Sequence, residues 1–170
     1  MMRASYETVL ADLRLLQKLA LYEPMVIGTP PLGIDIDSSD IDIACTAADL
    51  EQFKSDVTKT FGNEAEFCVG NIQRLPEPAV RAAFIAEGWE IELFCQSIPI
   101  AKQWGVRHFL VELRLLTLKP ALRSKVIELK KSGLKTEPAF AKILNLAGDP
   151  YEAMLELEDL PDEELVALST

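Results

Sequence analysis

The stretch "GTPPLGIDIDSSDIDIAC", residues 28–45, places four aspartates within eight positions, 35–42, and puts isoleucine between most of them. An exposed acidic loop does not need the isoleucines, and a buried strand does not tolerate carboxylates without partners. In an extended chain successive side chains point to opposite faces, so Asp40 and Asp42 share one face and Ile41 and Ile43 share the other. The pattern indicates a strand that is anchored by isoleucines and presents carboxylates to a cation.

The cation that fits this stretch best is magnesium. Carboxylates on alternate strand residues lie about 6.5 to 7 Å apart, and paired divalent ions in phosphoryl-transfer sites lie about 3.5 to 4 Å apart. Oxygen-only ligands favour Mg²⁺, so we predict a metal site at Asp40 and Asp42. The alternative is a solvated turn beside an edge strand. A calcium loop starting at Asp35 is disfavoured, because Asp40 replaces the required glycine and Thr46 the closing glutamate.

The composition predicts a soluble, cytoplasmic protein. The chain has 170 residues, 49% of them hydrophobic, which is enough for one domain with a core of its own. We find no apolar run of membrane-spanning length and no targeting pattern at the N-terminus. The net charge of −10 argues against general DNA or RNA binding. The cysteines at 45, 68 and 95 form no CxxC pair and are expected to be reduced core residues.

Hydrophobic periodicity predicts an α+β fold, with a mixed sheet backed by helices and a C-terminal helical bundle. The expected helices cover 6–21, 47–61 with Thr46 as N-cap, 103–119, 120–131, 137–147 and 150–157, followed by an acidic tail. The expected strands are 25–28, 41–45 and two or three strands within 66–94, with turns at 29–31, 76–78 and 87–88. The change of period near Pro99 divides the chain into an α/β core, 1–98, and a helical region, 99–170, packed on that core.

Two parts of the sequence resemble a known superfamily. Gly28-Thr29, a spacer and then Asp40-Ile41-Asp42-Ile43 resembles the signature of the DNA polymerase beta-type nucleotidyltransferases. The downstream segments "EIELFCQ", 90–96, and "QWGVRHFLVELRLL", 103–116, resemble a bacterial branch known only as a domain of unknown function. The core resemblance covers about residues 10–94, roughly half of the chain.

The resemblance implies a role for each matching residue. Gly28 and Thr29 would hold the triphosphate, and Asp40 and Asp42 would bind two Mg²⁺ ions. Glu92 would be the third carboxylate, which binds metal and activates the acceptor hydroxyl. Magnesium screens the triphosphate and stabilises charge on the leaving pyrophosphate, and in-line positioning supplies much of the remaining rate.

Two features depart from the superfamily pattern. Pro30 and Pro31 follow Thr29 and donate no backbone hydrogen bond, and the third carboxylate is glutamate where aspartate is more usual. Both departures allow a protein that keeps the fold without turnover. Glu90 shares its strand face with Glu92, so alternation does not separate the two, and we prefer Glu92 for its apolar neighbours.

The segment 103–119 contains further polar candidates. Arg107 would contact phosphate and His108 would bind the acceptor or the base; the alternative is an ordinary polar helix face. Trp89 and Trp104 are expected in the core, with base stacking as the alternative.

The sequence therefore supports two classes of function. The first is a magnesium-dependent nucleotidyltransferase that moves a nucleoside monophosphate from a nucleoside triphosphate to a hydroxyl of a small molecule, a protein or an RNA end. The second is a catalytically silent nucleotide-binding or protein-interaction module on the same fold. A partner of a toxin–antitoxin pair is a third, weaker hypothesis.

Overall fold

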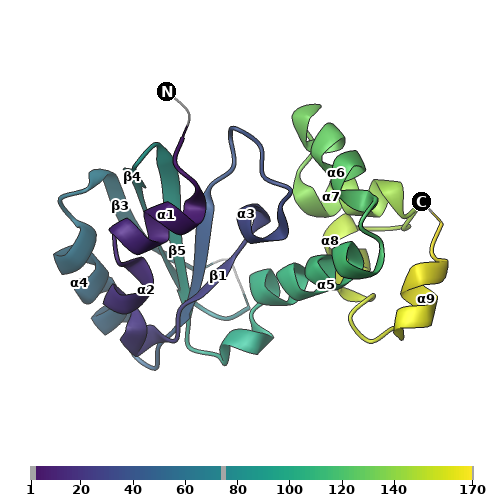
Figure 1. Cartoon of the computed structure of the whole chain (residues 1–170). Helices are drawn as coiled ribbons and strands as arrows, with labels where there is room; N and C mark the ends of the chain where they lie inside the picture. Colours follow the sequence, from purple (N-terminus) through teal and green to yellow (C-terminus); the bar gives the residue numbers. More distant parts are fainter. Residues whose placement is uncertain (1–2, 74–75, 170) are drawn as a thin grey trace. The chain divides into compact units, whose positions relative to one another are not determined.

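The computed structural model describes residues 3–73 and 76–169, and five strands within these ranges form one mixed sheet in the order β1-β2-β5-β4-β3 (Figure 1). The strands are β1 Met25–Ile27, β2 Ile41–Thr46, β3 Ala65–Ile72, β4 Ala79–Ala86 and β5 Trp89–Gln96. The central pair, β2 and β5, runs parallel, and the other neighbours run antiparallel. The prediction of a mixed sheet with helices is confirmed.

The chain divides into two compact units, which we describe separately. The sheet unit comprises residues 1–28 and 39–103, and the helical unit comprises 29–38 and 104–170. This differs from the division expected near Pro99, because residues 29–38 group with the helices. Leu32 and Ile34 are buried, and their carbonyl oxygens accept hydrogen bonds from Arg123 and Lys130 of the helical unit.

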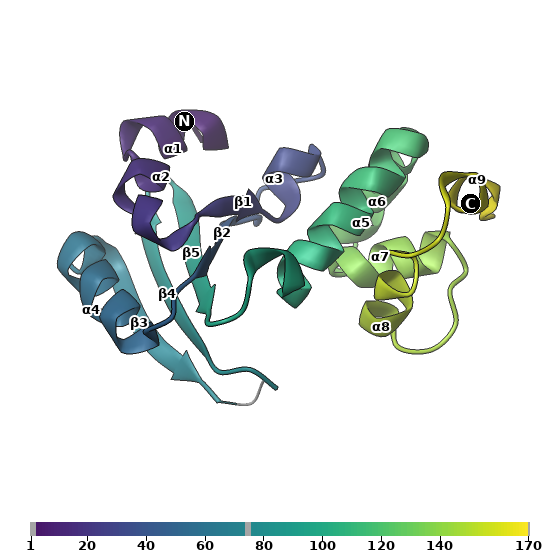
Figure 2. The ribbon, with the colours of Figure 1, turned by 90° about the horizontal axis from the view of Figure 1, so that it is seen from below.

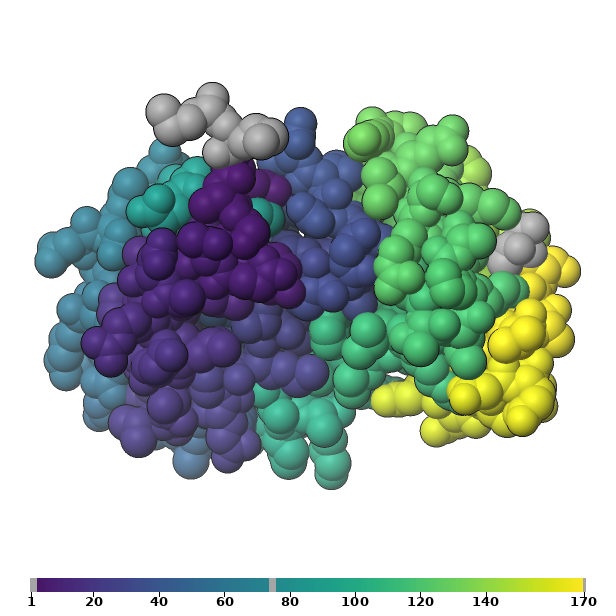
Figure 3. Space-filling model, viewed as in Figure 1, coloured from purple at the N-terminus to yellow at the C-terminus, as the bar shows by residue number. Residues whose placement is uncertain are grey.

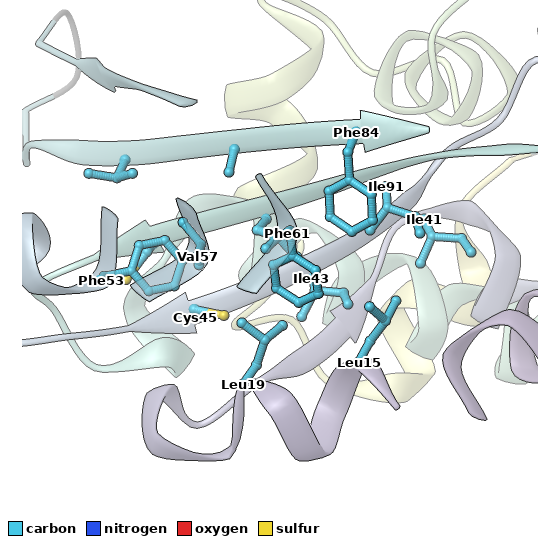
Figure 4. Packing of buried hydrophobic residues seen from close by; sticks show 14 of the residues in the cluster. Leu15, Leu19, Ile41, Ile43, Cys45, Phe53, Val57, Phe61, Phe84 and Ile91 are labelled. Carbon is cyan, nitrogen blue, oxygen red and sulfur yellow. The ribbon is translucent and has the colours of Figure 1, made fainter. Parts of the chain in front are cut away.

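Three helices cover one face of the sheet: α1 Tyr6–Asp12, α2 Leu15–Lys18 and α4 Leu50–Phe61 (Figures 1 and 2). In the space-filling view, α1 and α2 form the outer surface of this side (Figure 3). Beneath them the isoleucines of β2 lie in the core with helix residues such as Leu15 and Phe61 (Figure 4). Ile41 and Ile43 have no exposed surface, which confirms their predicted orientation.

The continuous helix expected over 6–21 is broken at Arg14, which adopts a left-handed backbone conformation with φ 53°. A 3-10 turn, η1 Ala20–Tyr22, follows α2. Val9 and Leu15 are both buried in the sheet core. In an unbroken helix these positions would lie about 120° apart around the axis, so the break lets both side chains reach the same core.

The start of α4 also differs from expectation. Thr46 is the last residue of β2, and its hydroxyl donates a hydrogen bond to Ile98 O over 2.8 Å. Asp49 is the N-cap and accepts a hydrogen bond of 3.0 Å from Gln52 N. Threonine and aspartate both cap helices well. Because Thr46 is part of β2, the helix is capped by Asp49 instead. Gly62 ends the helix as predicted.

The helical unit contains α3 Thr29–Leu32, α5 Trp104–Leu118, α6 Leu122–Lys131, α7 Thr136–Ile143, α8 Pro150–Leu155 and α9 Asp162–Ala167. Helix α7 packs against α6 and α8, and α5 contacts α8 and α9. The segment expected as an acidic tail contains α9, which buries Leu165 and is held to α5 by an ion pair of 2.6 Å between Arg114 and Asp162. Acidic residues in a first turn favour helix formation, which explains this difference.

Cys45 and Cys95 are buried as expected, whereas the expectation for Cys68 is wrong. Cys68 is exposed because β3 is an edge strand with mostly exposed residues. Among the described residues, no helix has both the length and the apolar character needed to cross a membrane.

Candidate active site

Asp42 and Glu92 lie side by side on neighbouring strands. In the parallel register of β2 and β5, Asp42 is the direct partner of Glu92. Paired residues of adjacent strands point to the same face, and the isoleucines on either side of Asp42 occupy the opposite, helix-covered face. Asp40 lies just before β2 and acts electrostatically on both carboxylates. The structure therefore places Asp42 and Glu92 on the same face of the sheet, with Asp40 close enough to act on both.

The strand register also distinguishes Glu92 from Glu90, which the alternation of side chains along the strand does not do. Glu92 pairs with Asp42, whereas Glu90 lies before the start of the β2–β5 ladder. The side chain of Glu92 is 24% exposed and that of Glu90 is 51% exposed. Glu92 is therefore the carboxylate with the neighbour and the burial that a shared site requires.

Gly28 lies directly against the side chain of Asp42. It follows β1, whose last residue Ile27 pairs with Asp42, and its φ of 78° is in the left-handed region. A Cβ atom at position 28 would lie 2.3 Å from Asp42 Oδ2, which is far inside van der Waals contact. Glycine is thus required at this position both for the backbone conformation and for the space that the carboxylate occupies.

The segment expected as a turn at 29–31 is the short helix α3, which begins at Thr29. Pro30 and Pro31 fit there because the first N–H groups of a helix have no intrahelical acceptor to lose. Gly33 N and Ile34 N donate to Pro30 O and Thr29 O and close the segment. Thr29 directly follows Gly28 in the chain but groups with the helical unit.

A residue that the sequence analysis did not select, Arg81, lies at the carboxylates. Arg81 on β4 donates from Nε to Glu92 Oε2, and its Nη2 lies 3.4 Å from Glu90 Oε1. The sequence signal was a lone basic residue within the apolar strand "AVRAAFIA", 79–86. The arginine therefore supplies positive charge to an otherwise acidic face.

Burial and like charges control the protonation of the site. Burial, reinforced by Asp40 and Glu92, raises the pKa of Asp42 to about 8. Burial also raises the pKa of Glu92, although the Arg81 guanidinium acts in the opposite direction. A buried carboxylate beside two others is favoured in its neutral form until a cation compensates the charge.

The three carboxylates are suitable ligands for magnesium, but their side chains are not arranged around a common metal position. Asp40, Asp42 and Glu92 offer only carboxylate oxygens, the ligands that Mg²⁺ prefers. Within residues 3–73 and 76–169, no three side chains of His, Cys, Asp or Glu are arranged to hold a metal ion. Glu92 is instead in contact with the Arg81 guanidinium.

Arg107 and His108 lie on α5 and have partners within the helical unit. Arg107 donates from Nε and Nη2 to Glu158 Oε2 at 2.9 and 2.6 Å. His108 is buried, and its Nε2 lies 2.9 Å from Tyr151 O; because a carbonyl only accepts, this nitrogen carries the hydrogen. Their predicted contacts with phosphate and acceptor stay predictions.

The two tryptophans differ. Trp89 is buried as expected, and its indole N–H donates to Ala4 O over 2.9 Å. Trp104, also expected in the core, is 53% exposed at the first turn of α5.

Comparison with solved structures identifies the fold. A Cid1 poly(U) polymerase bound to MgGTP matches with a TM-score of 0.56 and 15% identity, over 88% of this chain and 47% of that one. Cid1 in complex with the UTP analog UMPNPP matches with a TM-score of 0.53 and 16% identity, over 88% and 46%. A cytoplasmic RNA terminal U-transferase matches with a TM-score of 0.53 and 15% identity, over 84% and 41%. The fold is that of the nucleotidyltransferases, and the chain spans less than half the length of these structures.

The family model named Domain of unknown function (DUF4269) matches residues 8–157, and the chain belongs to this family. No curated protein matches the chain. The expected bacterial origin stays a prediction.

Proposed function

We propose that this protein is a magnesium-dependent nucleotidyltransferase that transfers a nucleoside monophosphate from a nucleoside triphosphate to a hydroxyl group. The observation that carries the proposal is the pairing of Asp42 with Glu92 across the central parallel strands, with Asp40 adjacent, on a nucleotidyltransferase fold. The same three residues carry the resemblance to the nucleotidyltransferase signature in the sequence.

The roles follow from position and charge. Asp40 and Asp42 would hold Mg²⁺, which, when bound, neutralises triphosphate charge and stabilises the leaving pyrophosphate. Glu92, held on the same face as Asp42, would complete the metal ligands and accept the proton of the attacking hydroxyl. Gly28 and Thr29 would hold the triphosphate, as their resemblance to the nucleotidyltransferase signature implies.

The acceptor class is open among a small molecule, a protein and an RNA end. The structural relatives are named as poly(U) polymerases and RNA terminal uridylyl transferases, which makes an RNA 3′ hydroxyl the first acceptor to test. The net charge of −10 requires that any RNA be held by local contacts, because the overall field repels it.

The test is calorimetric titration of a non-hydrolysable nucleoside triphosphate with and without Mg²⁺. We expect binding that requires Mg²⁺ in the wild type and is lost in Asp40→Asn/Asp42→Asn. The matched control is Asp35→Asn/Asp37→Asn, which removes the same charge from the same acidic stretch and should bind normally. Magnesium-independent binding, or equal binding by both double variants, would refute the assignment.

A catalytically silent binding module is the second candidate, and one observation favours it. Glu92 is bonded to Arg81, and the described residues contain no ready metal cluster. Triphosphate binding without pyrophosphate release, with each acceptor class supplied, would decide for this alternative. A toxin–antitoxin role stays a prediction.

A further inference from the structure

Arg81 contacts Glu92 although the two residues are not directly opposite each other in the β4–β5 pairing. Its Cα partner on β5 is Phe94, and the partner of Glu92 is Ala83. The guanidinium therefore extends two residues along the sheet to reach Glu92, over a position where alanine leaves room for it. Glu92 and Glu90 both face this guanidinium, with Nε and Nη2 directed at different carboxylates.

This contact does more to the charge of the site than to the stability of the sheet. The Arg81 side chain is 37% exposed, and ion pairs with this degree of exposure contribute little to folding. Its electrostatic effect is larger, because a single positive charge lies beside three carboxylates that otherwise repel one another.

Arg81 opposes metal binding at Glu92 through its charge. Its contact uses one of the two carboxylate oxygens, Oε2, and leaves the other available, but it places a positive charge beside any metal ion that Glu92 binds. Metal binding therefore has to overcome this repulsion.

We propose that Arg81 is a built-in counter-ion to Glu92 in the metal-free protein and that its charge weakens the binding of a divalent metal ion at these carboxylates. This inference rests on the proposed function, because it assumes that the carboxylates bind metal. Arg81 is then a positioning residue, which holds Glu92 by one oxygen and acts on the metal through its charge. The consequence is a site whose metal affinity is held below what its three carboxylates alone would give.

The test uses Mn²⁺ as the probe, without nucleotide, in calorimetry and in electron paramagnetic resonance of free Mn²⁺. Arg81→Met should bind Mn²⁺ about tenfold more tightly than wild type, since it removes a positive charge from beside the metal position. Arg81→Lys, which keeps the charge, is the matched control and should stay within about threefold of wild type. Glu90→Gln removes the weaker contact together with a negative charge that acts on Asp42, so it should bind Mn²⁺ more weakly than wild type. Circular dichroism establishes that each variant is folded.

The outcomes separate the inference from the proposed function. Wild-type binding that depends on Asp42 but is equal or weaker in Arg81→Met overturns the counter-ion alone. No Mn²⁺ binding by any folded variant overturns both. Unchanged Mn²⁺ affinity together with weaker binding of a Mn²⁺-triphosphate in Arg81→Met would make Arg81 a phosphate ligand and also overturn the inference.

Discussion

Replacement of Gly28 by alanine tests the geometry of the site most directly. The substitution meets two separate obstacles: the left-handed φ of 78°, and a Cβ position 2.3 Å from Asp42 Oδ2. The backbone conformation costs a non-glycine residue about 1 to 2 kcal/mol. Overpacking typically adds about 1 to 3 kcal/mol. We therefore expect Gly28→Ala to lower the free energy of unfolding by about 2 to 5 kcal/mol.

The chain offers a matched control for the backbone term. Gly88, in the β4–β5 turn, has the same φ of 78°, but its added Cβ would meet only Arg3 Cγ at 3.7 Å. Gly88→Ala should therefore lose only the conformational part, about 1 kcal/mol. The difference between the two variants measures the clash with Asp42.

Urea unfolding of both variants, in the wild-type background and with Asp42→Ala, gives a double-mutant cycle. In the Asp42→Ala background the carboxylate is gone, so the cost of Gly28→Ala should fall toward that of Gly88→Ala. Mn²⁺ binding should be weakened in Gly28→Ala, because its Asp42 carboxylate must move. Equal costs for Gly28→Ala and Gly88→Ala in both backgrounds would refute the close packing of Gly28 on Asp42.

Three further changes test other parts of the structure. Burial and like charges raise the pKa of Asp42 from 3.8 to about 8, so the folded state loses stability as the pH rises through this interval. At pH 8.5 Asp42→Asn should therefore be more stable than the metal-free wild type by on the order of 2 kcal/mol, whereas at pH 4 it should not be. Urea unfolding in the presence of a chelator measures both values. Burial also raises the pKa of Glu112 well above 4.5, so Glu112→Gln should raise the melting temperature at pH 8 but not at pH 4 in calorimetric scans. Tyr22 OH donates to Asp56 Oδ2 over 2.5 Å, and Tyr22→Phe should lower the free energy of unfolding by about 1 kcal/mol, with no loss if Asp56 is already Ala.

The parts of the fold that the sequence predicted are those governed by local periodicity. Alternation in 40–43 placed Ile41 and Ile43 in the core, and period two in 66–94 predicted the strands that became β3, β4 and β5. Local capping chemistry was less decisive, since Thr46 and Asp49 both make good N-caps and the length of β2 settled the choice.

The remaining features depend on contacts between distant residues. Ile34 belongs to the same alternating stretch as Ile41, yet its backbone is bound by Lys130 of the helical unit. Periodicity indicates that a residue is buried but not in which core. The contact of Arg81 with Glu92 likewise depends on the β4–β5 register, which neither strand's sequence specifies by itself.

The parallel pairing of β2 with β5 has a consequence for the order of folding. The β1–β2 pair and the β3–β4–β5 meander each connect residues that are near in the chain, whereas β2 meets β5 only by closing a loop from position 46 to position 89. Non-local pairings of this kind form late and slowly. The carboxylates at 42 and 92 therefore become neighbours only in that closing step. We expect an ion that needs both carboxylates to slow the opening of the finished sheet and to leave its rate of assembly nearly unchanged.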